Sequence, residues 1–188
     1  MSRILVVYGS TYGHTQRVAE RIANVVREGA HSADLVWAAR LPKGLDLYDY
    51  DGVVIAASVL MGHHQAYVRD FVRRHAEQLN AMPSAFVSVC GAASGDPPQA
   101  QSYIDRFLLE TGWWHPTVTR SFTGAVAYTR YSPLLRWWLK RISRRQGLPT
   151  DTSHDWDFTE WDDVERFARH FGAMATKAPR HPAHRSVA

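Results

Sequence analysis

The chain has 188 residues, of which 45% are hydrophobic, and a formal net charge of +4 at pH 7. This length and composition can build one sizeable core, so we expect a single globular domain. The one cysteine, Cys90, excludes an internal disulfide framework and favours a reducing cytoplasm. The first apolar run is too short for a signal peptide, and no stretch approaches the roughly 18 apolar residues of a membrane-spanning helix.

Charge is distributed unevenly in the second half of the chain. Residues 111–150 contain seven Arg or Lys and no Asp or Glu, whereas residues 151–165 contain seven acidic residues and no Arg or Lys. This local concentration of positive charge bears on the choice of partner more than the net charge does. The basic segment has no recognised nucleic-acid motif, so we expect no nucleic acid partner.

A strand, a short loop and a helix are expected at the start of the chain. Residues 4–7 are an apolar run typical of a strand buried on both faces, and residues 15–27 have apolar side chains at helical spacing. The loop between them, residues 10–15, is called the phosphate loop here, because backbone N–H groups and the dipole at a helix start favour a phosphate. It lacks the Walker lysine and GxGxxG, so a phosphate monoester without magnesium fits best. An ordinary turn with hydroxyl caps is the alternative.

Strands and helices alternate along the rest of the chain. Apolar patterns predict further strands over residues 33–37, 52–57, 85–89 and 118–127, and helices over residues 65–79, about 98–109 and 161–174. Thr159 with Asp162 resembles a capping box, which predicts the start of the last helix. This alternation implies a parallel sheet covered on both faces. Residues 175–188 contain two prolines and few large apolar groups, and we expect a disordered tail there.

Three loops are expected to meet where the parallel strands end. They are the phosphate loop, residues 58–64 and residues 90–98, and ligands of open parallel sheets bind at this edge. A flavin needs phosphate donors at one end and a flat slot with backbone donors at the other. The small residues 91–95 suit the slot.

These segments resemble a known family. STYGHT is similar to the phosphate loop S-T-x-x-G-x-T of the flavodoxin-like, menaquinone-dependent protoporphyrinogen dehydrogenases of bacteria. YDGVVIAASVLMGHH resembles their third strand and GH-containing flavin loop, and MPSAFVSV resembles their fourth strand. GAVAYTRY, the basic-aromatic helix after it and TDT at residues 150–152 are similar to the segment that distinguishes this family from ordinary flavodoxins. The resemblance covers roughly residues 3–175, and it rests on the joint order and spacing of these pieces.

The resemblance implies a fold and a function. The expected fold is α/β and flavodoxin-like: a doubly wound, five-stranded parallel sheet of order 2-1-3-4-5, with a basic helical insert at about residues 130–152. Residues 1–174 would form the FMN-binding domain of an enzyme on the cytoplasmic face of the cell membrane. That enzyme would oxidise protoporphyrinogen IX to protoporphyrin IX and pass electrons to a membrane quinone. The expected cofactor-binding residues are Ser10, Thr11, Tyr12, Gly13, His14, Thr15, Ser58, Val59, Leu60, Met61, Gly62, His63, Cys90, Gly91, Ala92 and Ala93.

The insert is expected to form a basic amphipathic helix over residues 132–146. Ser132 is a good N-cap, and Pro133 suits the first helical position. Such a helix with tryptophans suits an anionic membrane surface, and its Arg and Trp side chains can also contact a porphyrin and its propionates. Packing on the domain with a solvated, Arg-rich face is the alternative. The candidate substrate- or membrane-binding residues are Arg130, Arg136, Trp137, Trp138, Lys140, Arg141, Arg144 and Arg145.

His63 is the candidate catalytic residue. It matches the family's GH and can hydrogen-bond the flavin or move protons, although His63 and His64 also fit a pair of exposed loop histidines. Cys90 is expected to be inert packing at the end of a strand. Asp151 either caps the turn that follows it or counters the basic helix.

The histidines show no metal-ligand spacing, so we expect no metal. A flavodoxin-like electron carrier that docks an acidic protein, and a quinone reductase with another substrate, are the alternative functions. Homo-oligomerisation is left open.

Overall fold

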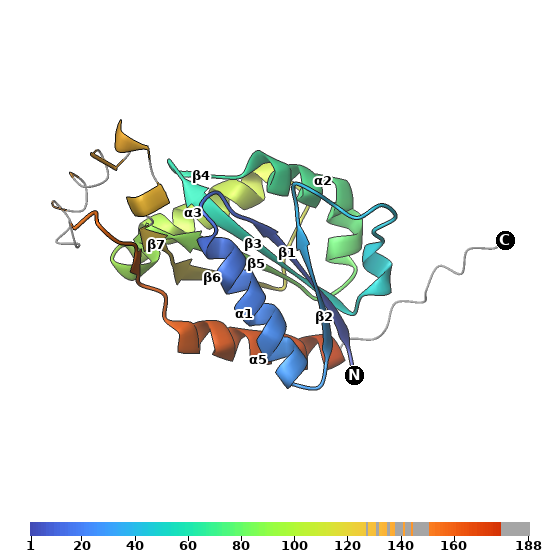
Figure 1. Cartoon of the computed structure of the whole chain (residues 1–188). Helices are drawn as coiled ribbons and strands as arrows, with labels where there is room; N and C mark the ends of the chain where they lie inside the picture. The colour runs from blue at the N-terminus through green and yellow to red at the C-terminus, as the bar shows by residue number, and fades with distance from the viewer. Residues whose placement is uncertain are drawn as a thin grey trace.

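A parallel sheet forms the centre of the computed structural model, which describes residues 1–126, 128–130, 132–134, 136–137, 141, 144 and 151–177. Its parallel strands lie in the order β2-β1-β3-β5-β6 (Figure 1). Counted along the chain, these five strands have the predicted order 2-1-3-4-5. Their bounds are β1 Arg3–Gly9, β2 Ser32–Trp37, β3 Gly52–Leu60, β5 Ser84–Cys90 and β6 Val118–Thr123.

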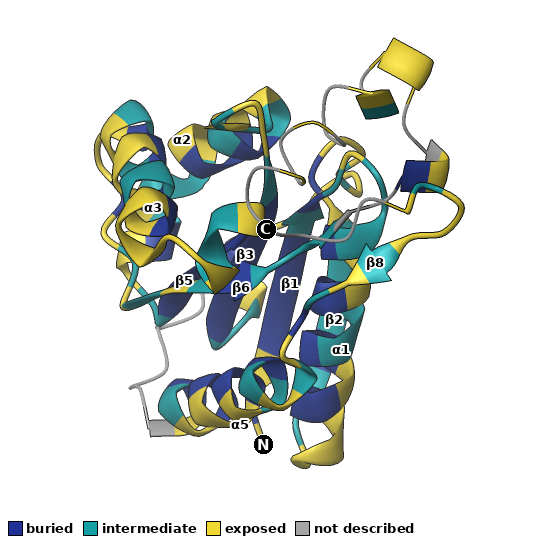
Figure 2. Ribbon diagram, turned by 90° about the vertical axis from the view of Figure 1, so that its left-hand side faces the viewer, coloured by how far each residue is buried: buried dark blue, intermediate teal, exposed yellow. Residues whose placement is uncertain are grey.

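Each central strand contributes side chains to two hydrophobic cores, because successive residues point to opposite faces of a sheet. Ile4 and Val6 of β1 join the core under α1 and α5, and Leu5 and Val7 join the core under α2 and α3. Figure 2 shows the buried strands between helices whose outer surfaces are exposed. Because helices cover both faces of the sheet, the side chains of β1 are buried on both faces, which explains the continuous apolar run of residues 4–7. The helices are α1 His14–Glu28, α2 Ala66–Asn80, α3 Pro97–Thr111 and α5 Trp161–Lys177, with short 3-10 turns η1 Leu47–Asp49, η2 Gly91–Ser94 and η3 Tyr128–Arg130.

The prediction of one strand over residues 118–127 is wrong in its second half. β6 ends at Thr123, where the backbone N–H of Gly124 donates to the carbonyl of Cys90 at 3.3 Å. After this glycine the chain leaves the sheet, and β7 Ala125–Val126 pairs antiparallel with β8 Trp156–Asp157. Glycine weakens a strand interior, which is the physical reason for the break. We call the β7–β8 pair the stem of the insert.

A short hairpin adds a sixth strand to the expected five. β3 continues past its predicted end to Leu60, turns at Met61 and Gly62, and pairs with β4, His63–His64. Met61 has φ 51° and Gly62 has φ 83°, so both central residues of the turn have positive φ, as a type I′ hairpin requires. Glycine tolerates this conformation, whereas at Met61 it costs on the order of 1 kcal/mol.

The insert and the end of the chain differ in part from expectation. The backbone N–H of Arg136 donates to the carbonyl of Ser132 at 2.8 Å, as the predicted helix start requires. α5 runs to Lys177, so Ala175, Thr176 and Lys177 are helical rather than part of a tail. Within the described ranges, no helix combines the length and the apolar character needed to cross a membrane. Residues 178–188, together with Trp138, Lys140 and Arg145 of the insert, lie outside the described residues.

Candidate cofactor and substrate site

The phosphate loop connects β1 to α1 and leaves donors available at the helix start. Gly13 occupies the N-cap position with φ 89°, and its backbone N–H donates to Ser10 Oγ at 2.9 Å. No side chain of the described residues caps α1. Thr15 is 1% exposed, and its hydroxyl has no hydrogen-bond partner within the described part of the chain. Because a buried, unpartnered hydroxyl is costly, these features indicate an anionic ligand group at this position.

Gln65 joins the phosphate loop to the end of β3. Its side-chain amide donates to Thr11 Oγ1 at 3.0 Å and also to Ser58 Oγ. A Cβ at Gly9 would lie 2.3 Å from Val68 Cγ2, so only glycine allows α2 to pack this closely beneath the loop. We assigned no role to Gln65 from the sequence, and no motif or periodicity marks it.

The two adjacent histidines of the β3–β4 hairpin have different surroundings. The half-buried ring of His64 meets the stacked rings of Phe86 and Phe107 edge-on, with centroids at 5.1 and 5.0 Å, and its Nε2 lies 2.9 Å from Ser88 Oγ. Burial lowers the pKa of His64 to about 4, so its ring is neutral at pH 7. The His63 side chain is 63% exposed, and its Nδ1 lies 4.0 Å from Glu110 Oε1. The His63 ring is therefore open to solvent, whereas the His64 ring packs against the core.

Side chains of α2 and α3 hold the hairpin in place. Arg106 donates from Nη1 to the carbonyl of Gly62 at 3.1 Å, at the tip of the turn. Glu110 of α3 accepts from Arg69 Nη1 of α2 at 2.9 Å, and this hydrogen bond links the two helices. Arg106 and Glu110 were not predicted from the sequence, because they lie on helix faces with no motif.

The third loop begins at Cys90 and continues through η2. Burial raises the pKa of the Cys90 thiol, against hydrogen bonds from the backbone of Ala93 and Ala92 and from Ser88. The thiol therefore stays protonated, in agreement with the expectation of inert packing. Gly91 is exposed, and a Cβ there would meet no atom within 4 Å, so the loop leaves open space suited to a flat ring. The hydrogen bond of His64 to Ser88 ties the second loop to the strand that leads into this third loop.

His14 connects the phosphate loop to the segment that returns from the insert. Its Nε2 lies 2.7 Å from Thr159 Oγ1, and its side chain is 10% exposed. Burial lowers the pKa of His14, although Asp157 at 3.8 Å opposes this effect. The predicted capping box at Thr159 is wrong, because the Thr159 hydroxyl donates to the carbonyl of Thr123 at 2.9 Å. At the start of α5 the carbonyl of Glu160 accepts from Val164 N–H instead.

The insert joins the domain through its stem and exposes apolar side chains. Asp155 Oδ1 accepts from the backbone and hydroxyl of Thr129 at 2.9 and 2.8 Å. Asp151 Oδ1 accepts from Ser153 N–H at 2.9 Å, which confirms that Asp151 caps the turn after it. Leu134 is 76% exposed and Trp137 is 61% exposed, so these two do not pack on the domain.

The predicted substrate- or membrane-binding residues Arg141 and Arg144 are also exposed, and Arg136 is half-buried. Arg130 is the last residue of η3. The described parts of the insert lie at the same end of the sheet as the β3–β4 hairpin (Figure 1).

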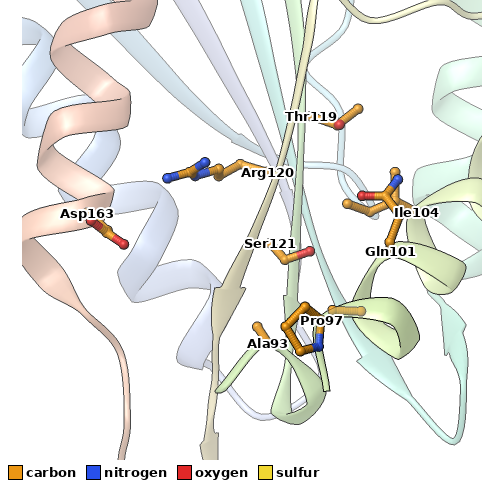
Figure 3. Close-up of a pocket in the computed structure, with 9 residues that line it drawn as sticks. Ala93, Pro97, Gln101, Ile104, Thr119, Arg120, Ser121 and Asp163 are labelled. Carbon is orange, nitrogen blue, oxygen red and sulfur yellow. The ribbon is translucent and has the colours of Figure 1, made fainter. Parts of the chain in front are cut away.

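A groove of about 290 Å³ follows the outer edge of the sheet, away from the phosphate loop. Figure 3 shows Arg120 of β6 and Asp163 of α5 pointing toward each other on one side of it, with Gln101 and Ile104 of α3 on the other. Of the predicted site residues that the structure describes, only Ala93 lines this groove. Elsewhere in the described chain, no group of three His, Cys, Asp or Glu side chains is placed to hold a metal ion.

Comparison with known proteins identifies in this chain the flavodoxin domain that this arrangement of strands and loops indicates. The family profile with the description Flavodoxin domain matches residues 5–153. The chain is 33% identical over 178 residues, 93% of this chain and 97% of the relative, to the protoporphyrinogen IX dehydrogenase (quinone) of Escherichia coli strain K12. It is 32% identical over 183 residues, 96% of this chain and 79% of the relative, to the protein of the same name from Leishmania major.

Solved structures show the same fold. A flavodoxin from the domain Archaea has a TM-score of 0.55 at 16% identity, covering 93% of this chain and 99% of that one. Oxidised Flavodoxin 1 from Bacillus cereus has a TM-score of 0.53 at 19% identity, with coverage of 95% and 99%. The unpartnered Thr15 hydroxyl and the open space above Gly91 fit the phosphate and the ring of a flavin mononucleotide. The chain therefore belongs to the protoporphyrinogen IX dehydrogenase (quinone) family of flavodoxin-domain oxidoreductases, and its cofactor is FMN.

Proposed function

We propose that this protein oxidises protoporphyrinogen IX with bound FMN and passes the electrons to a membrane quinone. The observation that carries the proposal is the buried, unpartnered hydroxyl of Thr15 at the start of α1. It supports a phosphate-bearing cofactor in a chain that is 33% identical, over 93% of its length, to a relative whose name states this substrate and acceptor.

The phosphate loop and two further loops would hold FMN. Ser10, Thr11, Gly13, His14 and Thr15 would bind the phosphate through hydroxyl and backbone donors, since no Lys or Arg lies within this loop. The segment from Ser58 to His63 and the segment from Cys90 to Ala93 would enclose the ring. The chemistry that FMN supplies when bound is redox, with hydride accepted from the porphyrinogen and electrons returned to the quinone.

His63 would move protons during the oxidation, acting as the general acid or base beside the ring. Its exposed imidazole is open to solvent, whereas the half-buried ring of His64 is hydrogen-bonded to Ser88.

The insert would bring the enzyme to its substrate and to the membrane. Arg136, Arg141 and Arg144 would pair with the propionates of the porphyrinogen, and Trp137 would pack on its macrocycle. The same basic and apolar side chains would bind peripherally to an anionic membrane surface, on the inner face of the cell membrane. The exposure of Leu134 and Trp137 supports this role over packing on the domain.

An anaerobic assay of the FMN-loaded protein tests the proposal. Purified protein is mixed with protoporphyrinogen IX and a menaquinone analogue, and porphyrin fluorescence is followed. We expect porphyrin formation that needs both protein and quinone, with free FMN and FMN-free protein as matched controls. A protein that binds FMN but forms no porphyrin above these controls contradicts the substrate. A quinone reductase or an electron carrier would then be tested by quinone reduction with another donor.

A further inference from the structure

Three hydrogen-bonded groups link the phosphate loop to the segment that returns from the insert. His14 Nε2 lies 2.7 Å from Thr159 Oγ1, and the Thr159 hydroxyl donates to the carbonyl of Thr123 at 2.9 Å. His14 is the first residue of α1, Thr123 is the last residue of β6, and Thr159 lies between β8 and α5. A single side chain at residue 159 therefore joins three elements at the edge of the cofactor site.

The hydroxyl of Thr159 fixes the proton position on His14. A threonine hydroxyl has one hydrogen, and the carbonyl of Thr123 can only accept it. The oxygen of Thr159 must then accept from His14, so Nε2 carries the proton of the neutral ring. His14 Nδ1, on the side of the ring nearer its own backbone, has no hydrogen-bond partner in the part of the chain that the structure describes.

Charged and aromatic groups close around the same ring. Asp157 of β8 lies 3.8 Å from His14 Nε2 and 3.4 Å from Arg17 Nη1 of α1. Trp161, the first residue of α5, meets the His14 ring edge-on at 6.0 Å and lies under the Arg17 guanidinium at 5.5 Å. The segment of residues 151–159, called the return segment here, therefore docks on the start of α1, at the helix end where we propose that the phosphate binds.

We propose that Thr159 is a positioning residue for the FMN phosphate, and that through His14 it couples cofactor binding to docking of the return segment, residues 151–159. This inference rests on the proposed phosphate site at the start of α1. Without the Thr159 oxygen, Nε2–H of His14 loses its acceptor at hydrogen-bond distance, and the ring must shift to reach another, such as Asp157. The phosphate loop then has to be ordered by FMN itself, which weakens binding.

Coupling of this kind is reciprocal. If docking of the return segment strengthens FMN binding, FMN binding must stabilise the docked return segment by the same factor. We expect Thr159→Val to raise the Kd for FMN about 5- to 150-fold, the usual range for coupled sites. Thr159→Ser keeps the hydroxyl and is the matched control, with a Kd like that of the parent protein. Riboflavin, which lacks the phosphate, should bind all three proteins equally.

Two measurements test the inference. Fluorescence titration gives the Kd of FMN and riboflavin, and hydrogen exchange of residues 151–160 is compared with and without FMN. We expect FMN to slow exchange there in the parent protein and the serine variant, but not in Thr159→Val. The coupling is wrong if the parent protein binds FMN and Thr159→Val binds it equally well, or if FMN protects residues 151–160 in neither protein. No FMN binding by the parent protein would instead overturn the proposed function.

A second variant keeps the test decisive if Thr159→Val folds poorly. His14→Phe removes the same hydrogen bond from the other side and keeps a planar ring against Trp161. In the double variant His14→Phe/Thr159→Val, the loss of FMN affinity should be smaller than the sum of the two single losses, because both remove one bond. Additive losses would contradict a role of Thr159 through His14.

Discussion

The phosphate loop and the insert lie at the same end of the sheet but are built in opposite ways. The phosphate loop is held from several sides, by Ser10 within the loop, by Gln65 from the next loop and by Thr159 from the return segment. The described helical residues of the insert instead expose Leu134 and Trp137, and the stem joins them to the domain.

This difference matches the two tasks that we propose for the two regions, which are to bind FMN and to contact the substrate and the membrane. The fixed donors of the phosphate loop would bind FMN without a cost of ordering them at the moment of binding. Exposed apolar and basic side chains suit a large substrate or a membrane surface, because both approach the protein from solvent and contact its surface. If this division is correct, changes in one region should leave the task of the other intact.

Removal of the insert tests the division most strongly. We replace residues 131–150 by a short Gly-Ser turn, which keeps the stem and the Thr129–Asp155 bonds. Loss of substrate positioning should lower turnover of protoporphyrinogen on the order of 100-fold or more. FMN affinity, measured by fluorescence titration, should stay unchanged. Full turnover, or loss of FMN binding from a folded protein, would show that the two regions are not separable.

The pH dependence of stability tests how firmly the loops are anchored. Burial lowers the pKa of His64 to about 4 from 6.5, so between these values the unfolded chain takes up a proton that the folded protein excludes. The free energy of unfolding should therefore fall as the pH drops from 6.5 to 4, by about 3 kcal/mol from His64 alone. The lowered pKa of His14 acts in the same direction.

Denaturant unfolding between pH 7.5 and pH 4 measures this slope. His64→Gln, which can still bond Ser88, should flatten it. His170→Gln, on the exposed surface of α5, is the control and should keep the parent slope. If the free energy of unfolding has the same pH dependence in the parent protein and in His64→Gln, a group other than His64 takes up the proton.

Membrane binding tests the insert without touching the cofactor. Each basic residue at an anionic surface contributes about 1 kcal/mol, so Arg141→Gln with Arg144→Gln should weaken vesicle binding by about 2 kcal/mol at low salt. Arg166→Gln with Arg169→Gln makes the same change in charge on α5 and should have little effect. Flotation with anionic and neutral vesicles measures binding. Equal recovery with both kinds of vesicle would argue against the membrane role.

The smallest effect is expected at Thr15, where affinity and stability should change in opposite directions. Thr15→Val removes a donor to the phosphate and should weaken FMN binding by about 1.5 kcal/mol, or about tenfold. The FMN-free protein should be as stable as the parent or more so, because the variant no longer buries an unpartnered hydroxyl. Thr15→Ser keeps the hydroxyl as a control. Unchanged FMN affinity on titration, or a lower thermal midpoint, would contradict this account.

Local patterns predicted the sheet and its helices because burial on both faces requires long apolar runs. Residues 4–7 and 52–57 could hardly be exposed, and their strands pair side by side. The break at Gly124 was missed because Ala125 and Val126 continue an apolar strand pattern. Their partner, β8, lies beyond the insert, and no local periodicity reports a pairing at that distance.

The site followed the same rule. Residues of the three loops could be predicted as candidates because strand ends and small residues mark them in the sequence, and their role in binding FMN stays a prediction. Gln65 and Thr159 were missed as site residues because their partners, Thr11 and His14, lie 54 and 145 positions away. Thr159 was read as a helix cap because a hydroxyl beside a helix start usually bonds its own helix. Here it bonds two other elements instead.

The distance between His14 and Thr159 also bears on when the protein acquires its cofactor during synthesis. The ribosome delivers the phosphate loop first, but the partner of His14 follows 145 residues later. All three loops that we propose to hold FMN have left the ribosome well before β8 and α5 exist. A nascent chain that stops before residue 159 should therefore hold FMN weakly. Cofactor loading then becomes one of the last events in the production of this flavoprotein.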